Sequence, residues 1–167
     1  MKQSELQEVQ FTKILESHKK LVFKIANAYS RNKEDRQDLV QEVVLHLWKA
    51  FPKYDKKYSF STWIYRIALN VSISYYRKEK TREKTYSGYQ TQVEIINSED
   101  LVFDKRLKQL YKFIDQLKSL DKAIIILYLE GLKNKEIADI MGMSITNVST
   151  KMNRIKNKLS SNFESKK

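Results

Sequence analysis

The sequence predicts an all-α protein built from two small helical modules joined by a flexible linker. The 167 residues include only three glycines and one proline, so few positions interrupt a helix. Apolar residues recur at steps of three and four over most of the chain, which is the spacing of one helix face. The charged residues also fall into three blocks of alternating sign, which indicates two modules rather than one.

The three charge blocks set the expected domain boundaries. Residues 1–80 carry 16 basic and 9 acidic side chains, residues 81–104 carry 2 and 5, and residues 105–167 carry 14 and 6. The whole chain has a net charge of +12, and a basic surface attracts polyanions. We therefore expect anion-binding modules at 1–80 and 105–167, with a polar linker at 81–104.

Several functional classes find no support in the sequence. The chain has no cysteine, which excludes disulfides and thiolate metal sites, and its two histidines, His18 and His46, are interpreted as structural. No secretion signal, membrane-spanning run, glycine-rich phosphate loop or nucleophile beside a base is found. We expect a cytoplasmic protein that is not an enzyme and uses no cofactor, metal or small-molecule substrate.

The first module begins with two predicted helices, one over residues 5–30 and one over residues 38–51 that Pro52 closes. One side of the second helix is acidic although the module is basic, so this side is not expected to face DNA. It is either a solvated face or a docking surface for a basic protein partner. Its residues are Asp38, Gln41, Glu42 and Leu45.

A third predicted helix, Phe60–Lys78, carries two stripes. The inner stripe consists of Phe60, Trp63, Ile64, Ile67, Val71 and Tyr75. The outer stripe consists of Thr62, Tyr65, Arg66, Leu69, Asn70, Ile73, Tyr76 and Arg77. Bases stack on aromatic rings and guanidinium groups hold phosphates, so the outer stripe suits single-stranded nucleic acid. The alternative is that Tyr65, Leu69 and Ile73 pack on a second neighbouring helix.

The second module shows a helix-turn-helix pattern. Asp121 is expected to cap a helix that ends at Gly131, Gly142 allows a tight turn, and Ser144 is placed to cap the last helix. That helix is expected to present short polar groups to base edges and lysines to phosphates. An ordinary helical hairpin is the alternative. The candidate residues are Thr146, Asn147, Ser149, Thr150, Lys151, Asn153, Arg154 and Lys156, with Lys158 beside them.

Taken together, these motifs resemble bacterial RNA polymerase sigma factors of the extracytoplasmic-function (ECF) type, in the sigma-70 family. Asp38-Leu-Val-Gln-Glu-Val with Leu47-Trp48 resembles the start of region 2. Phe60-Ser-Thr-Trp-Ile-Tyr-Arg-Ile-Ala-Leu-Asn70 with Arg77-Lys78 resembles the promoter-melting helix. The pattern between Leu120 and Leu159 resembles region 4. The resemblance covers residues 10 to 160 approximately, and the melting-helix string is its most specific part.

The resemblance implies a division of labour. The acidic face would dock on core RNA polymerase, the last helix would read duplex −35 DNA, and an anti-sigma factor would be a further partner. The unpaired −10 strand would lie along the third helix and the loop before it. The residues implied for that strand are Tyr58, Ser61, Thr62, Tyr65, Arg66, Asn70, Arg77 and Lys78.

The pattern also departs from the family in the last helix. Family members often have arginine where this chain has Ser149, and a glycine-threonine pair where it has Thr146-Asn147, so the common −35 sequence is not assumed. Two alternatives remain. A stand-alone helix-turn-helix regulator would leave the aromatic helix and the face of Glu42 unexplained. A basic membrane-surface or scaffold protein would need bulky apolar groups that the polar faces lack.

Overall fold

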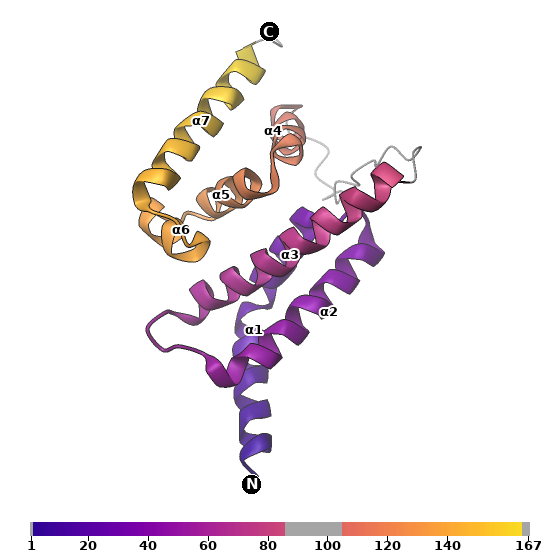
Figure 1. The fold of residues 1–167 in the computed structure, drawn as a ribbon, viewed down its shortest axis with the longest axis vertical. Coiled ribbons are helices and arrows are strands. Elements are labelled where there is room, and N and C mark those ends of the chain that lie inside the picture. The colour runs from indigo at the N-terminus through magenta and orange to yellow at the C-terminus, as the bar shows by residue number, and fades with distance from the viewer. Residues whose placement is uncertain (1, 86–104, 165–167) are drawn as a thin grey trace. The chain divides into compact units, whose positions relative to one another are not determined.

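The computed structural model describes residues 2–85 and 105–164, and the regular structure within those ranges is helical (Figure 1). The described residues up to Thr85 form one compact unit, and those from Lys105 form a second. The predicted all-α fold in two modules is therefore confirmed. Among the described helices, none is long and apolar enough to cross a membrane.

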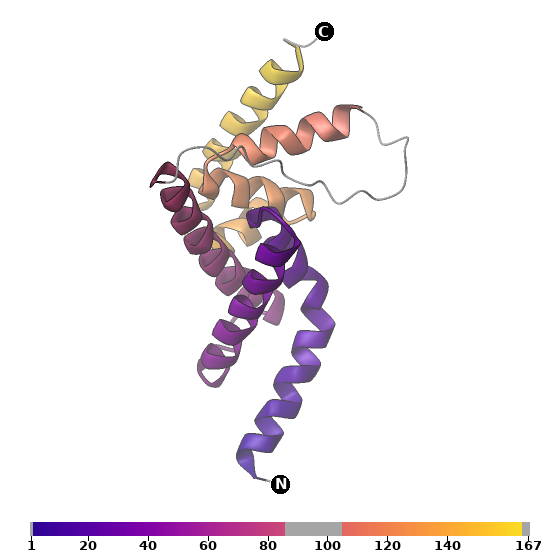
Figure 2. The ribbon, with the colours of Figure 1, turned by 90° about the vertical axis from the view of Figure 1, so that its right-hand side faces the viewer.

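The first unit is a bundle of three helices in which each helix packs on the other two. The helices are α1 (Gln3–Tyr29), α2 (Lys33–Ala50) and α3 (Phe60–Thr85), with the short 3-10 turn η1 (Phe51–Lys53) after α2. Asn32 caps α2, because its side-chain oxygen accepts a hydrogen bond from the Asp35 backbone N–H at 2.8 Å. The first turns of α1 extend past the end of α2 in both views (Figures 1 and 2).

The orientation of α3 about its own axis differs from the sequence expectation. Its buried face is centred on Ala68 and Ser72, both with 0% of their surface exposed. Tyr65, Leu69 and Ile73 are only 8%, 2% and 7% exposed, so the expectation that they face outward was wrong. The buried face of α3 is therefore rotated by roughly 100° about the helix axis from the predicted inner face, which corresponds to a shift of one residue.

The physical reason is that α3 has two helical neighbours, α1 and α2, and so buries a wide face. The centre of that face is occupied by small side chains, which let helix axes approach closely. A periodicity analysis gives alanine and serine little hydrophobic weight, so it placed the centre of the face on larger residues instead. The packing interpretation of Tyr65, left open by the sequence, is the one the structure supports.

An aromatic cluster links the N-terminal half of α1, the C-terminal end of α2 and the N-terminal end of α3. Its members are Phe11, Trp48, Phe51, Tyr54, Phe60 and Trp63, from α1, α2, η1, the following loop and α3. Tyr54 stacks on Phe60 with 4.4 Å between ring centroids, and meets Trp63 edge-on at 5.3 Å. Each such pair contributes about 0.5–1.5 kcal/mol beyond its burial, so the cluster fixes the loop between α2 and α3.

The second unit contains the predicted helix-turn-helix, which is confirmed. Its helices are α4 (Lys105–Gln116), α5 (Ser119–Leu129), α6 (Asn134–Met141) and α7 (Ile145–Glu164). Gly142 ends α6 with φ of 66°, a left-handed conformation that glycine adopts without a steric penalty. Ser144 caps α7, since its Oγ accepts a hydrogen bond from the Asn147 N–H at 3.1 Å. Gly131, with φ of 85°, follows the end of α5 as predicted.

Two local expectations need correction. Asp121 does not cap α5, because that helix begins earlier, at Ser119, and Asp121 lies inside its first turn. The expected linker overlaps α3, which continues beyond Lys80 to Thr85 because nothing in that polar stretch breaks a helix. The remainder of the expected linker, residues 86–104, lies outside the described residues.

Candidate nucleic-acid interface

The exposed side of α3 carries one row of polar residues. Asn70 and Arg77 are exposed, and Thr62 and Arg66 are partly exposed. Their spacing of four, four and seven residues places them on one side of the helix. This row combines hydroxyl, guanidinium and amide groups, which can bind phosphates and the edges of unpaired bases.

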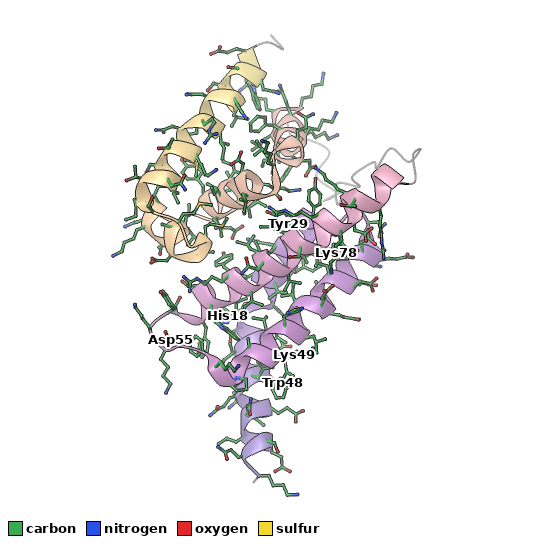
Figure 3. All side chains as sticks on the ribbon, in the orientation of Figure 1. His18, Tyr29, Trp48, Lys49, Asp55 and Lys78 are labelled. Atoms are coloured by element: carbon green, nitrogen blue, oxygen red, sulfur yellow. The ribbon has the colours of Figure 1, made fainter. Side chains whose placement is uncertain are left out.

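The other members of the predicted −10 surface lie in different places. Lys78 is exposed beside the row, at the labelled position in Figure 3. Ser61 is partly exposed on the first turn of α3. Tyr65 is buried and does not belong to the surface. Ser59, which the sequence interpretation did not single out, donates a hydrogen bond from its Oγ to the Thr62 Oγ1 at 3.1 Å and so positions that residue.

The loop before α3 presents one aromatic ring to this row. The guanidinium carbon of Arg66 lies 4.4 Å from the centre of the Tyr58 ring, a cation–π contact. The hydroxyl of Tyr54 donates a hydrogen bond to the backbone carbonyl of Tyr58. A turn at Asp55, whose Oδ1 accepts from the Lys57 N–H at 2.9 Å, orders the loop further. The ring and the cation are therefore held together before any ligand arrives.

The acidic side of α2 is accessible as predicted. Asp38, Gln41 and Glu42 are exposed, and Leu45 has 49% of its surface exposed. Sequence reasoning missed Trp48, which continues this side one turn beyond Leu45 and is also exposed (Figure 3). The signal was present, since Trp48 follows Gln41 by seven residues and so shares its face. The result is an acidic surface with an apolar end.

The N-terminal end of α2 contacts α3 through Tyr75, a residue of α3. Burial, followed by the negative charges of Asp35, Glu79 and Asp38, raises the pKa of the Tyr75 hydroxyl. Asp35 also forms a side-chain hydrogen bond with Tyr75. The phenol therefore stays protonated and links the two helices near Asp38.

The outer face of α7 carries most of the residues predicted to read duplex DNA. Thr146, Asn147, Thr150, Asn153 and Arg154 are all exposed. Thr150 donates its hydroxyl proton to the Thr146 carbonyl at 3.0 Å, so its hydroxyl oxygen remains available only as an acceptor. Val148, Met152 and Ile155 anchor the opposite side in the core, as predicted.

Three other predicted residues of α7 contact neighbouring helices. Ser149 is only partly exposed, and its Oγ accepts a hydrogen bond from the Asn134 side-chain amide on α6 at 3.1 Å. The Lys151 ammonium lies 3.9 Å from the Asp121 carboxylate on α5.

The third is Lys156, whose ammonium lies 4.5 Å from the centre of the Tyr128 ring at the end of α5. These contacts between helices require the tertiary arrangement, and sequence spacing could not reveal them. Of the predicted residues of α7, Thr146, Asn147, Thr150, Asn153 and Arg154 are the ones that stay on its exposed outer face.

Family models match both units. The model of sigma-70 region 2 matches residues 14–82, and the model of sigma-70 region 4 matches residues 107–159. The two matches cover the bundle with its polar row and the helix-turn-helix respectively.

Curated relatives match along most of the chain. The ECF RNA polymerase sigma-E factor of Escherichia coli (strain K12) is 31% identical over 146 residues, covering 78% of this chain and 76% of the relative. The RNA polymerase sigma factor SigV of Bacillus subtilis (strain 168) is 25% identical over 162 residues, covering 92% and 91%.

Solved structures share the fold. The sigma factor RpoE, in its complex with the anti-sigma factor NepR from Bartonella quintana, matches with a TM-score of 0.74 and 19% identity, over 93% of this chain and 97% of RpoE. CnrH, in its complex with the cytosolic domain of CnrY, matches with a TM-score of 0.69 and 20% identity, over 96% and 91%.

Proposed function

The chain belongs to the ECF RNA polymerase sigma factors, and from that membership we propose how its two units divide promoter recognition. The unit of residues 1–80, extended along α3 to Thr85, acts as region 2. The unit of residues 105–167 acts as region 4, and residues 86–104 connect the two. The protein acts in the cytoplasm by binding DNA and polymerase and not by catalysing a reaction.

The second unit reads the −35 element as duplex. The support for this role is the exposed polar face of α7, on a helix that its serine cap and buried residues hold in a fixed orientation. Asn153 supplies an amide that can bond a base edge in two places, and Thr146 and Thr150 supply small groups for the same groove. A good bidentate contact discriminates between bases by about 1–3 kcal/mol.

The first unit holds the unpaired −10 strand. The single observation that carries this proposal is the Tyr58 ring held at 4.4 Å from the Arg66 guanidinium beside the exposed Asn70. The Lys57 ammonium also lies over the ring, 5.7 Å from its centre, so an unstacked base can use the ring together with two cations. Base–aromatic stacking contributes about 1–3 kcal/mol per base, which offsets part of the free energy of opening the duplex.

Core RNA polymerase docks on the acidic side of α2. The support is an exposed patch of two carboxylates, an amide and the side chains of Leu45 and Trp48 on an otherwise basic chain. Apolar residues at the centre of such a patch supply affinity, and the charges select a basic partner. One of the solved structures described above is a complex with an anti-sigma factor, and we propose such a partner for this chain as well.

Run-off transcription with core RNA polymerase on fragmented genomic DNA tests the proposal. We expect discrete transcripts whose start sites share a spaced pair of motifs, and none from core polymerase alone. The variant Asn70→Ala should reduce transcription from duplex templates more than from templates mismatched across the −10 region. Transcripts that are identical with and without the chain would refute the proposed function.

A further inference from the structure

The outer side of α1 carries a regular stripe of residues that the proposed function does not use. Phe11 marks the inner side of the helix, because its ring packs edge-on against Trp48 and Phe51. On the opposite side, exposed residues recur at alternating steps of three and four, which is the heptad spacing of helices that pair side by side. We call this set the α1 stripe, and its members are Leu6, Val9, Lys13, Glu16, Lys20, Phe23 and Asn27.

The α1 stripe has exposed apolar residues towards both of its ends. Leu6, Val9 and Phe23 have 48%, 47% and 44% of their surfaces exposed. Leu6 and Val9 lie on the first turns of α1, which extend past the end of α2 (Figures 1 and 2). Helices in proteins gain most of their stability from packing an apolar face, so these residues favour a second helix as the occupant of the stripe.

The order of residues makes the α1 stripe complementary to a second copy of itself. The stripe is centred between Lys13 and Glu16, so an antiparallel copy places Lys13 of each chain opposite Glu16 of the other. In the same alignment, Leu6 at one end faces Phe23 at the other end of the second copy. A parallel copy would instead place Lys13 opposite Lys13 and Glu16 opposite Glu16, and these like charges repel.

The charges along α1 favour the same antiparallel alignment. Glu5 and Glu8 lie in the N-terminal half of the helix, whereas Lys19 and Lys24 lie in the C-terminal half. An antiparallel copy brings the acidic half of each helix beside the basic half of the other. Within one chain Glu16 pairs with Lys19 at 2.9 Å, but both side chains are 65% exposed, so this pair contributes little and leaves Glu16 accessible to a second chain.

We propose that two copies of this chain associate through an antiparallel pair of α1 helices along the α1 stripe. From Leu6 to Phe23 the contact extends for roughly 25 Å, so the interface is small and of the class that forms transiently. The dimer is therefore in a concentration-dependent equilibrium with the monomer. The stripe shares no residue with the acidic side of α2 or with the polar row of α3, so self-association uses a surface separate from those of the proposed function.

The acidic residues of α1 favour a second copy over a membrane or a nucleic acid. Anionic lipids and phosphates attract the lysines of the stripe, but both repel Glu16 at its centre and Glu5 beside it. A second copy of α1 supplies Lys13 to Glu16 and brings its basic half to Glu5. The alternating charges are therefore satisfied together by another α1 helix.

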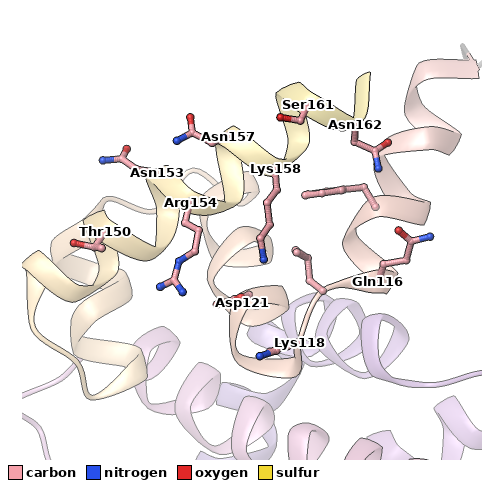
Figure 4. A pocket seen from close by; sticks show the side chains of 12 residues that line it. Gln116, Lys118, Asp121, Thr150, Asn153, Arg154, Asn157, Lys158, Ser161 and Asn162 are labelled. Carbon is pink, nitrogen blue, oxygen red and sulfur yellow. The ribbon is translucent and has the colours of Figure 1, made fainter. Parts of the chain in front are cut away.

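The groove of the second unit is a poorer site for the same helix. It lies between α7 and the corner where α4 meets α5, and it has a volume of about 1070 Å³ (Figure 4). The residues labelled in Figure 4 are polar, and the apolar lining residues Phe113 and Leu117 are only 6% and 7% exposed. A helix anchored by Leu6 and Phe23 needs exposed apolar contacts, which the α1 stripe of a second copy offers.

Cysteine crosslinking tests the alignment directly, because the chain has no cysteine of its own. The antiparallel pair places Val9 opposite Lys20, and both residues are exposed, so Val9→Cys and Lys20→Cys should leave the fold intact. A disulfide requires Cα atoms within about 7 Å, whereas positions 9 and 20 are roughly 16 Å apart along one helix. Under mild oxidation of the full-length chains, an equal mixture of the two variants should form a crosslinked dimer and each variant alone should not. Replacing Val9→Cys by Glu8→Cys, on a different side of α1, gives the control mixture.

Charge reversal tests the central ion pair by sedimentation velocity at increasing chain concentration. Lys13→Glu or Glu16→Lys alone should weaken self-association by about tenfold, because each makes two pairs of opposite charges into two pairs of like charges. An equal mixture of these two variants should recover wild-type association, since every glutamate then faces a lysine. Glu8→Lys makes the same change of net charge away from the stripe and should match wild type.

Three results would overturn the proposal. The first is a mixture of Val9→Cys and Lys20→Cys that does not crosslink, and the second is crosslinking of either variant with itself, which would indicate a parallel pair. The third is a wild-type chain that stays monomeric at every concentration. If that monomer co-sediments with vesicles containing phosphatidylglycerol and loses this binding in the double variant Leu6→Glu, Phe23→Glu, the α1 stripe is a membrane-binding surface instead.

Discussion

Two tyrosines seven residues apart, Tyr58 and Tyr65, should have opposite roles, and substituting each tests the corrected orientation of α3. Tyr65 is 8% exposed, so Tyr65→Ala removes an almost fully buried ring. Truncating a buried aromatic side chain costs about 3–5 kcal/mol of unfolding free energy. With a urea m value of about 2 kcal/mol per M, a loss of about 4 kcal/mol lowers the midpoint by about 2 M.

Tyr58→Ala should leave the fold nearly intact. It removes the cation–π contacts with Arg66 and Lys57, which contribute about 0.5–1 kcal/mol each and together shift the urea midpoint by at most about 1 M. The chain's two tryptophans, Trp48 and Trp63, both lie in the first unit, so their fluorescence follows the unfolding of that unit directly.

Promoter opening should rank the two residues in the reverse order. Permanganate footprinting detects unpaired thymines, and Tyr58→Ala should open a duplex promoter more weakly because one base loses its stacking partner, which costs about 1–3 kcal/mol or about 5–150-fold. A template already mismatched across the −10 region should restore its activity. Tyr65→Phe keeps the packed ring and should open duplex as wild type does. A Tyr65→Ala protein that remains as stable as wild type but fails to open duplex would refute this account of α3.

Four further outcomes follow from the contacts described. The double variant Asp38→Lys, Glu42→Lys should keep its helical circular dichroism but fail to retain core polymerase in a pull-down, and unchanged retention would contradict the docking surface. Asn153→Ala should relax the preference at one base position in a selection from random duplexes, whereas recovery of the wild-type motif would exclude base reading by that amide. Ser144→Ala should lower the unfolding free energy of the second unit by about 1 kcal/mol through removal of the α7 cap. Trp63→Ala should lower that of the first unit by less than the roughly 3–5 kcal/mol of a fully buried aromatic residue, because Trp63 is partly exposed. Both changes are measured by thermal denaturation with wild type as control.

Features that depend on residues close together in the chain could be predicted from the sequence alone. The Gly142 N–H donates to the Ala138 carbonyl four residues earlier, and Ser144 accepts from the Asn147 N–H three residues later, so the turn and the cap of α7 could be predicted from local chemistry. The exposure of Glu42 and of its neighbours on α2 could be predicted in the same way, because helical spacing alone separates that side from Leu39 and Val43. The motifs that indicated the family are likewise contiguous strings.

The buried side of α3 and the exposed residues of α7 depend on contacts between helices that are distant in the sequence. Ala68 and Ser72 lie at the centre of the buried face of α3 because α1 and α2 pack against it from different directions. The number of helices that pack on α3 cannot be read from the sequence of α3 itself. The hydrogen bond from Asn134 to Ser149 joins residues that are fifteen apart in the sequence. The turn between α6 and α7 brings these two side chains together. Periodicity places side chains on a helix face, but the partner that covers the face comes from distant parts of the chain.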